Sequence, residues 1–186
     1  MTRAEMKAAA KLQIKGNVGT MFVITLLTGL ISGTGIGSLL VPGIGLSLCM
    51  IYLNMTKGQK AGVGDMFGGI RYLGKAWWLN ILIAFFTMLW TYLFIIPGIV
   101  KSYSYSMATY ILADNPNLTA RQALNESKRI MNGHKWELFM IHLSFIGWHI
   151  LGGLTFGIAY IYIIPYMSAT VANFYNSIKG GVTVEI

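Results

Sequence analysis

The chain has 186 residues, of which 55% are hydrophobic and only 11% are charged. A soluble domain usually carries about a quarter of its residues as Asp, Glu, Lys and Arg, so this composition excludes an ordinary soluble fold. The formal net charge of +8 does not indicate a nucleic-acid partner, because basic residues flank membrane spans and contact anionic lipid headgroups. We therefore predict an integral membrane protein.

Three long blocks of the chain are almost free of charge: residues 16–56, 76–113, broken only by Lys101, and 138–178. About 20 apolar residues are enough for a helix to cross the hydrocarbon core, so each block has room for two spans. The six predicted spans lie at approximately residues 17–34, 38–56, 76–95, 98–114, 137–153 and 158–177.

The blocks recur at regular intervals, and each contains one proline, at Pro42, Pro97 and Pro165. Similarity at a fixed period is typical of a repeated unit. We predict an all-α fold in a single polytopic membrane domain, with three proline-punctuated hairpins and an amphipathic helix on the cytoplasmic side before each hairpin. The three copies are expected at residues 1–57, 58–116 and 117–179.

The polar helices before the hairpins have recognisable start signals. Thr2 with Glu5 and Thr119 with Gln122 fit capping boxes, and Asp65 is a plausible N-cap for the middle helix. Apolar residues recur at helical spacing in the two later helices, which predicts helices that lie along the membrane surface or pack beneath the spans. These residues are Met66, Ile70, Leu73 and Trp77 in one helix, and Ala120, Ala123, Leu124, Ser127, Ile130 and Met131 in the other.

Basic residues concentrate before the first span and in the segments that join the hairpins. The positive-inside rule then places both termini in the cytoplasm. Lysine and tryptophan side chains favour the level of the lipid headgroups. We expect membrane lipids to be contacted there by Lys75, Trp77, Lys135 and Trp136.

Residues 95–175 carry a series of short motifs. They are Pro-Gly-Ile at 97–99, Tyr-x-Tyr at 103–105, Leu-Ala-Asp-Asn-Pro at 112–116, Gly-x-Lys at 133–135, Ser-Phe-Ile-Gly-Trp at 144–148, Pro-Tyr at 165–166 and Phe-Tyr at 174–175. This series resembles the bacterial integral-membrane family called domain of unknown function 975 (DUF975). The resemblance implies a multi-pass protein of the bacterial cytoplasmic membrane, and it assigns no catalytic residue.

The fourth span is unusually polar. On a regular helix Lys101, Tyr105 and Thr109 share one face, and Tyr103 and Tyr110 belong to the same span. One interpretation is a polar pocket or path in which Lys101 binds an anionic group. The other is that Lys101 marks the outer end of a short span and reaches towards water, while the tyrosines and the serines between them make hydrogen bonds between helices.

Asp114, Asn115 and Pro116 stand where the fourth span leaves the membrane, and we interpret them as a helix stop, with partner docking as an alternative. His142 and His149 share a helix face but lack the further ligands that a metal site needs. Phosphate-binding loops, nucleophile elbows and paired intramembrane carboxylates are absent from the sequence. We therefore expect no catalytic residue, no metal and no cofactor.

These features favour a non-enzymatic membrane accessory or interaction protein. Its partner would be another membrane protein, a membrane-active peptide, membrane lipid or, through helix faces of small residues, a second copy of itself. The alternative is a small transporter or channel-like module with a polar path along the fourth span. A membrane-embedded enzyme acting on lipid is a third class, and no set of side chains in the sequence supports it.

Overall fold

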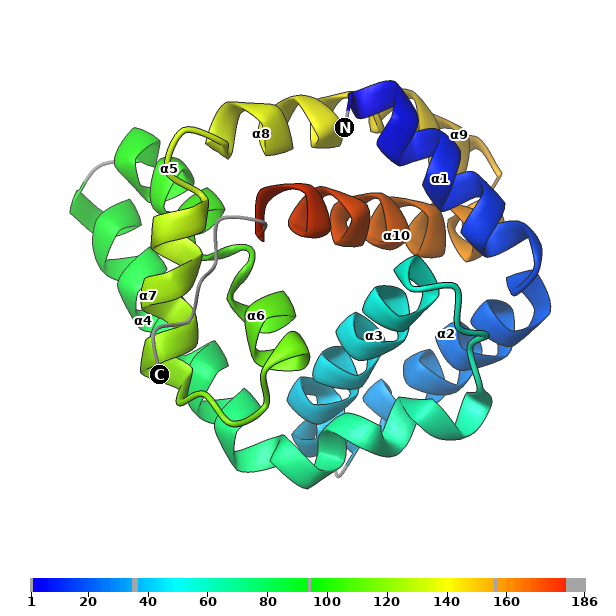
Figure 1. The fold of residues 1–186 in the computed structure, drawn as a ribbon, viewed down its shortest axis with the longest axis horizontal. Helices are drawn as coiled ribbons and strands as arrows, with labels where there is room; N and C mark the ends of the chain where they lie inside the picture. Colours follow the sequence, from blue (N-terminus) through cyan, green and yellow to red (C-terminus); the bar gives the residue numbers. More distant parts are fainter. Residues whose placement is uncertain (1, 35–36, 94, 156, 180–186) are drawn as a thin grey trace.

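The structure is a computed structural model that describes residues 2–34, 37–93, 95–155 and 157–179. Over these residues every regular element is a helix, which confirms the all-α class. Figure 1 shows helix α10 (Tyr160–Ile178) near the middle of the molecule, and it packs against α1, α2, α3, α8 and α9. Most of the side chains of its second half are buried, so α10 is the central element of the core.

The first third of the chain forms α1 (Arg3–Lys15), α2 (Val18–Ser32), the short 3-10 helix η1 (Gly37–Leu40) and α3 (Val41–Thr56). The predicted capping box of α1 is confirmed, since the Thr2 hydroxyl accepts from the Glu5 N–H and the Glu5 carboxylate accepts from the Thr2 N–H. Helices α1 and α2 meet at 88°. Pro42 lies in the first turn of α3, where a missing N–H costs nothing.

The middle third forms η2 (Val63–Tyr72), α4 (Leu73–Leu93), α5 (Ile95–Tyr105) and α6 (Ala108–Asp114). Two predictions are wrong here. Asp65 is not the N-cap of η2; it is the third residue of that helix, and its carboxylate accepts from the Gly62 N–H at 2.9 Å. The predicted fourth span is also not one helix, because α5 ends at Tyr105 and α6 begins at Ala108.

The apolar stripe expected from Met66 to Trp77 holds only in part. Met66 is buried, but Trp77 is exposed and its indole N–H donates to the Leu39 carbonyl at 2.9 Å. The prediction of this stripe assumed an α-helix with 3.6 residues per turn. Since residues 63–72 form a 3-10 helix with three residues per turn, Trp77 is rotated off the buried face.

The last third forms α7 (Ala120–Ile130), α8 (Lys135–Leu143), α9 (Ile146–Leu154) and α10. The capping box of α7 is confirmed, since the Thr119 hydroxyl accepts from the Gln122 N–H. The face predicted for α7 is buried at all six positions, also as predicted.

The break between α8 and α9 lies against α1. The Lys7 ammonium sits 4.4 Å above the Phe145 ring and donates to the Ser144 carbonyl at 3.5 Å. Partial burial lowers the pKa of the Lys7 ammonium. Carbonyls at the end of a helix lack partners within the helix, so a cation from α1 stabilises the end of α8.

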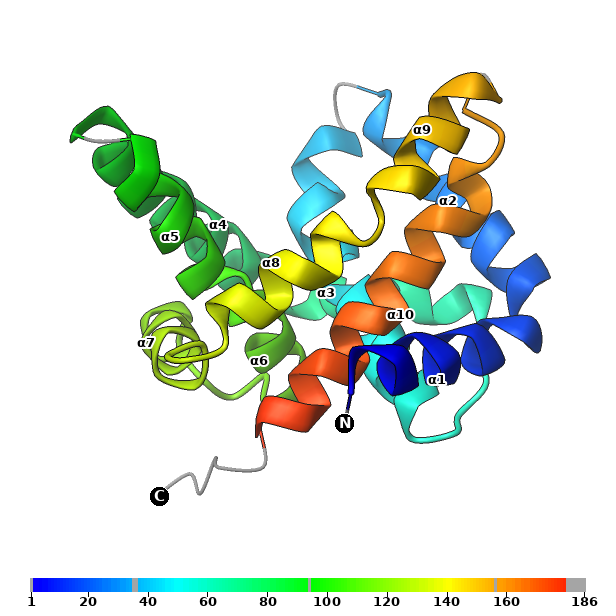
Figure 2. The ribbon, with the colours of Figure 1, turned by 90° about the horizontal axis from the view of Figure 1, so that it is seen from above.

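The hairpins point in one direction. In Figure 2 the far ends of α2, α4 and α9 lie on one side of the molecule, and α7, α1 and the 57–62 connection lie on the other. We call these two sides the hairpin end and the polar end. Each third of the chain supplies one helix at the polar end and then two segments that run to the hairpin end and back.

Three helical stretches are long and apolar enough to cross a membrane: Gly37–Thr56, Val63–Tyr92 and Lys135–Leu154. A fourth is added if Arg3–Lys15 and Val18–Ser32 are counted as one bent span. Neither α5 nor α6 reaches that length alone, and α10 is a buried helix with polar side chains. The number of six spans therefore stays a prediction.

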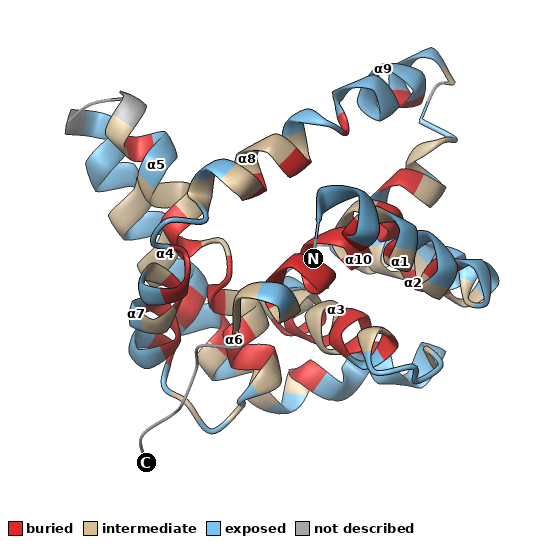
Figure 3. Ribbon diagram, turned by 45° about the horizontal axis from the view of Figure 1, so that its top comes forward, coloured by how far each residue is buried: buried red, intermediate tan, exposed pale blue. Residues whose placement is uncertain are grey.

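Large apolar side chains remain exposed along the hairpins. Figure 3 shows exposed residues over most of α9, and most residues of α4 are exposed as well, while buried residues gather around α3, α6 and α10. Such surface suits contact with acyl chains better than contact with water. The exposed apolar residues on α4 and α9 include Ile81, Phe85, Met88, Leu89, Tyr92, Ile146, Ile150, Leu151 and Leu154.

Candidate functional site

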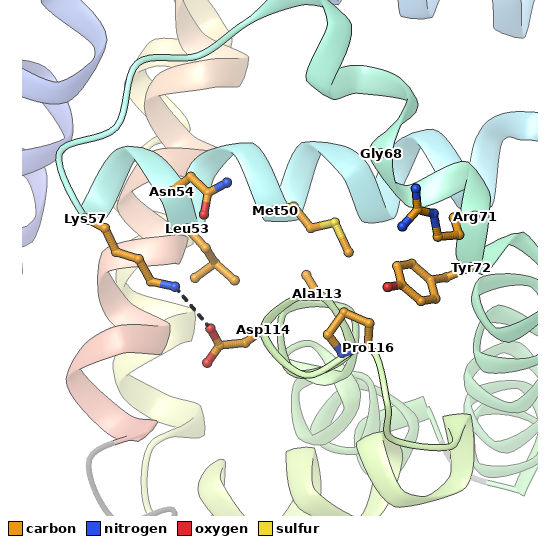
Figure 4. Close-up of a pocket in the computed structure, with 10 residues that line it drawn as sticks. All are labelled: Met50, Leu53, Asn54, Lys57, Gly68, Arg71, Tyr72, Ala113, Asp114 and Pro116. Carbon is orange, nitrogen blue, oxygen red and sulfur yellow. Dashed lines mark ion pairs between the residues drawn. The ribbon is translucent and has the colours of Figure 1, made fainter.

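A cavity of about 480 Å³ lies at the polar end between α3, η2 and the end of α6 (Figure 4). We call it the polar basin. Figure 4 shows Lys57 and Asp114 facing each other on one side and Arg71 beside Tyr72 on the other. The residues that line the basin are Met50, Leu53, Asn54, Lys57, Gly68, Arg71, Tyr72, Ala113, Asp114 and Pro116.

Close packing of η2 on α3 places Arg71 at the basin. The Gly69 N–H donates to the Ser47 hydroxyl at 2.7 Å, and that hydroxyl donates to the Gly43 carbonyl at 3.0 Å. A Cβ at Gly69 would lie 2.6 Å from the Ser47 backbone nitrogen, closer than side chains normally approach. Glycine at this position therefore allows the contact that sets the position of the Arg71 backbone.

Asp114 joins the ends of three helices. Its carboxylate lies 3.0 Å from the Lys179 ammonium and 3.7 Å from the Lys57 ammonium, and it accepts from the Tyr175 hydroxyl at 3.2 Å. Lys57 is the C-cap of α3, Lys179 is the C-cap of α10 and Asp114 is the last residue of α6. A carboxylate at a helix C-terminus is unfavourable by itself, and the two lysines offset this cost.

The predicted turn at Asp114, Asn115 and Pro116 forms one wall of the basin. Asp114 and Pro116 line it, while Asn115 is exposed and its N–H donates to the Ile111 carbonyl at 2.9 Å. The Lys75 ammonium donates to the Pro116 carbonyl at 2.7 Å. Lys75, which we predicted to contact headgroups, thus helps to hold this turn.

Lys135 and Trp136, by contrast, line a second cavity of about 210 Å³ between α5 and α8. The other lining residues are Ile99, Val100, Tyr103 and Phe139. We call this cavity the aromatic groove. Trp136 is 70% exposed, and its ring lies 5.1 Å from that of Phe139. Lys135 is half-buried and has no hydrogen bond or ion pair with any residue that the structure describes.

The residues of the predicted polar path have separate partners. The Lys101 ammonium lies 4.7 Å above the Trp90 ring of α4. Tyr105 is 2% exposed, and its ring lies 6.3 Å from that of Phe86. The break after Tyr105 puts Thr109 on another helix, so the prediction that Lys101, Tyr105 and Thr109 share one helix face is wrong.

Tyr103 and Tyr110 lie on either side of this break. The Tyr103 hydroxyl is 3.3 Å from Nδ1 of His142, and the Tyr110 hydroxyl donates to the Ser168 carbonyl at 3.4 Å. These tyrosines thus join helices, as one of our two interpretations predicted. The serines do not: the hydroxyls of Ser102, Ser104 and Ser106 all donate to carbonyls three or four residues earlier in their own segment.

Sequence reasoning missed the role of Lys57, Arg71 and Lys179, which it treated only as charges that orient the spans. They come from three segments far apart in the chain, and nothing in their local sequence indicates that Lys57 and Lys179 share the Asp114 carboxylate or that Lys57 and Arg71 line one cavity. Their positions next to helix ends were the only available signal, because basic residues are favoured in the last turn of a helix.

Comparison with known proteins places the chain in a family. A family model described as "Protein of unknown function (DUF975)" matches residues 83–181, more than half of the chain. No curated protein and no solved structure matches it. The matched segment contains the motifs that we identified between residues 95 and 175. The resemblance seen in the sequence is therefore confirmed, and the chain belongs to the DUF975 family.

Proposed function

We propose that this chain is a non-enzymatic accessory protein of the bacterial cytoplasmic membrane that binds anionic lipid in its aromatic groove. In this proposal the three hairpins cross the membrane six times and the polar end faces the cytoplasm. The common direction of the hairpins supports this topology. The basic residues of α1, α7 and the 57–62 connection, which lie together at the polar end, support it as well.

The observation that carries the lipid proposal is the environment of Lys135. Lys135 is half-buried, its ammonium is unpaired over the described part of the chain, and the rest of the groove is aromatic and aliphatic. A lysine with an apolar stem and a charged head suits the boundary between acyl chains and headgroups. An anionic lipid satisfies both parts of the site, because its headgroup pairs with Lys135 while its acyl chain lies against Val100, Tyr103 and Phe139.

A transport role has less support. Lys101 packs over Trp90, and Tyr105 is buried against Phe86, so the two residues do not form one polar surface. Lipid binding requires only what the groove supplies: a lysine among the lining residues, aromatic walls, and Tyr103 fixed by its contact with His142.

Native mass spectrometry of the purified chain tests the proposal. The protein is transferred to nanodiscs that contain equal parts of phosphatidylglycerol and phosphatidylcholine, and the lipids retained after mild detergent extraction are counted. A basic side chain at the membrane surface contributes about 1 kcal/mol to the binding of anionic lipid, or about five-fold in affinity. Lys135→Gln should therefore lower phosphatidylglycerol retention by about five-fold.

Trp136→Ala should lower the retention of both lipids, because it removes part of the apolar wall. Lys11→Gln, at an exposed position of α1 away from the groove, is the matched control and should behave as the wild type. Equal retention by Lys135→Gln and Lys11→Gln would contradict the proposal.

A further inference from the structure

We propose that the polar basin binds a phosphomonoester group, with Arg71 and Lys57 as its cationic ligands. This site is at the polar end and is formed by α3, η2 and α6, whereas the aromatic groove lies between α5 and α8. The proposal does not depend on lipid binding in the groove.

The charge of the basin indicates an anionic ligand. Lys57 and Arg71 line the basin together with one carboxylate, that of Asp114, and Lys179 pairs with the same carboxylate, so these three cations and one anion carry a net charge of +2. Lys75 adds a further positive charge behind Pro116. A phosphomonoester carries a charge of about −1.5 to −2 at neutral pH, so it balances the cluster more closely than a carboxylate or a phosphodiester does.

Arg71 is available for such a ligand. It is exposed at the edge of the basin, and it makes neither a hydrogen bond nor an ion pair with the described residues. A guanidinium presents parallel N–H groups whose spacing matches two oxygens of a phosphate. In Figure 4 the guanidinium of Arg71 and the ring of Tyr72 lie on the same side of the basin.

Lys57 can turn to a ligand without leaving Asp114 unpaired. Its ammonium is 3.7 Å from the carboxylate, which is longer than a hydrogen bond, and its side chain is 53% exposed. Lys179 at 3.0 Å and Tyr175 at 3.2 Å keep the carboxylate satisfied. Asp114 therefore acts as a positioning residue, which holds Lys57 at the rim of the basin.

The size and the walls of the basin suit a small polar ligand. A volume of about 480 Å³ falls in the range typical of small-molecule sites, roughly 300–1,000 Å³. Met50, Leu53 and Ala113 supply apolar surface, and the side-chain amide of Asn54 supplies a further donor and acceptor. A soluble phosphomonoester and the headgroup of phosphatidic acid share the required chemistry.

Titration calorimetry on the full chain in phosphatidylcholine nanodiscs tests the proposal, with inorganic phosphate and glycerol 3-phosphate as soluble probes. A parallel arm compares retention of phosphatidic acid and phosphatidylcholine by native mass spectrometry. Loss of a hydrogen-bonded charged group weakens binding by about ten-fold or more, so Arg71→Gln should lose at least that factor and Arg71→Lys should lose less. Lys57→Gln should also weaken binding, whereas Arg121→Gln, an exposed position on α7, should not.

Binding of the soluble probes that depends on Arg71 identifies a soluble phosphomonoester as the ligand. Retention of phosphatidic acid alone, again dependent on Arg71, identifies a lipid headgroup. Either result supports the site. Wild-type affinity in both Arg71→Gln and Lys57→Gln, or no binding of any probe, would overturn it. Lys135→Gln separates the two proposals, because it should alter lipid retention in the groove and leave phosphate binding in the basin unchanged.

Discussion

Substitution of Gly69 by alanine probes the contact that builds the basin. A Cβ at this position would lie 2.6 Å from the Ser47 backbone nitrogen and 2.7 Å from the Ser47 hydroxyl oxygen, and closer still to the Gly43 carbonyl oxygen. Two of these three atoms belong to the backbone of α3, which cannot move aside as a side chain does. Non-bonded carbon atoms prefer a separation of about 3.5–4 Å, so η2 would have to move away from α3 by about 1 Å.

The expected cost follows from this displacement. Overpacking of a tight contact costs about 1–3 kcal/mol. Loss of the hydrogen bond from the Gly69 N–H to Ser47 adds about 1 kcal/mol. A chain of this size loses about 2–4 °C of unfolding midpoint per kcal/mol, so we expect a decrease of about 4–16 °C for Gly69→Ala.

Thermal unfolding in detergent, followed by intrinsic tryptophan fluorescence, measures the effect. Gly64→Ala is the matched control, because it lies in the same 3-10 helix and its added methyl group meets nothing within 4 Å. We expect Gly64→Ala to be neutral or slightly stabilising, since alanine restricts the unfolded chain more than glycine does. An equal unfolding midpoint for Gly69→Ala and the wild type would refute the packing of η2 on α3.

Three further substitutions test other contacts. Asn173→Ala should lower the free energy of unfolding by about 1–3 kcal/mol, because the buried Asn173 amide exchanges two 3.1 Å hydrogen bonds with Gln13. A double-mutant cycle with Gln13→Ala, measured by thermal unfolding, should show coupling between the two substitutions. Additive effects would contradict the pairing of the two amides. The Lys101→Met variant should insert into the membrane and fold, and its free energy of unfolding should fall by about 0.5–2 kcal/mol because the cation–π contact with Trp90 is lost. Failure of this variant to insert would show that Lys101 is needed for more than this contact. Asp114→Asn should lower the unfolding midpoint, because it removes the carboxylate that pairs with Lys179 and Lys57. It should also weaken glycerol 3-phosphate binding in calorimetry, because Lys57 is no longer held at the rim of the basin, and unchanged or tighter binding would contradict the positioning role of the carboxylate.

The parts of the fold that could be predicted from the sequence depend on local interactions. The capping boxes at Thr2 and Thr119 involve residues three positions apart, and the buried face of α7 follows from a pattern within one helix. Long apolar blocks between basic segments likewise indicate membrane helices wherever they occur. The all-α class and the membership of the family were both within reach of such reasoning.

The parts that could not be predicted depend on contacts between distant segments. The 3-10 geometry of residues 63–72 accompanies a hydrogen bond from Gly69 to Ser47, 22 positions away. The basin needs Lys57, Arg71 and Asp114 to approach from three elements, and no local pattern records this. The sequence likewise gives no indication of the hydrogen bond from the Lys75 ammonium to the Pro116 carbonyl, 41 positions away.

The topology, with the hairpin end outside and the polar end in the cytoplasm, is tested most directly by cysteine accessibility in intact cells. Cys49 is the only cysteine, so Cys49→Ala provides a background for single cysteines. Thr34 follows the end of α2 and Leu154 ends α9, which places them at the hairpin end, while Lys60 belongs to the 57–62 connection and Asn132 follows α7 at the polar end. With a membrane-impermeant maleimide, we expect labelling of Thr34→Cys and Leu154→Cys in intact cells, and of Lys60→Cys and Asn132→Cys only after permeabilisation. Labelling of Lys60→Cys or Asn132→Cys in intact cells would contradict the account.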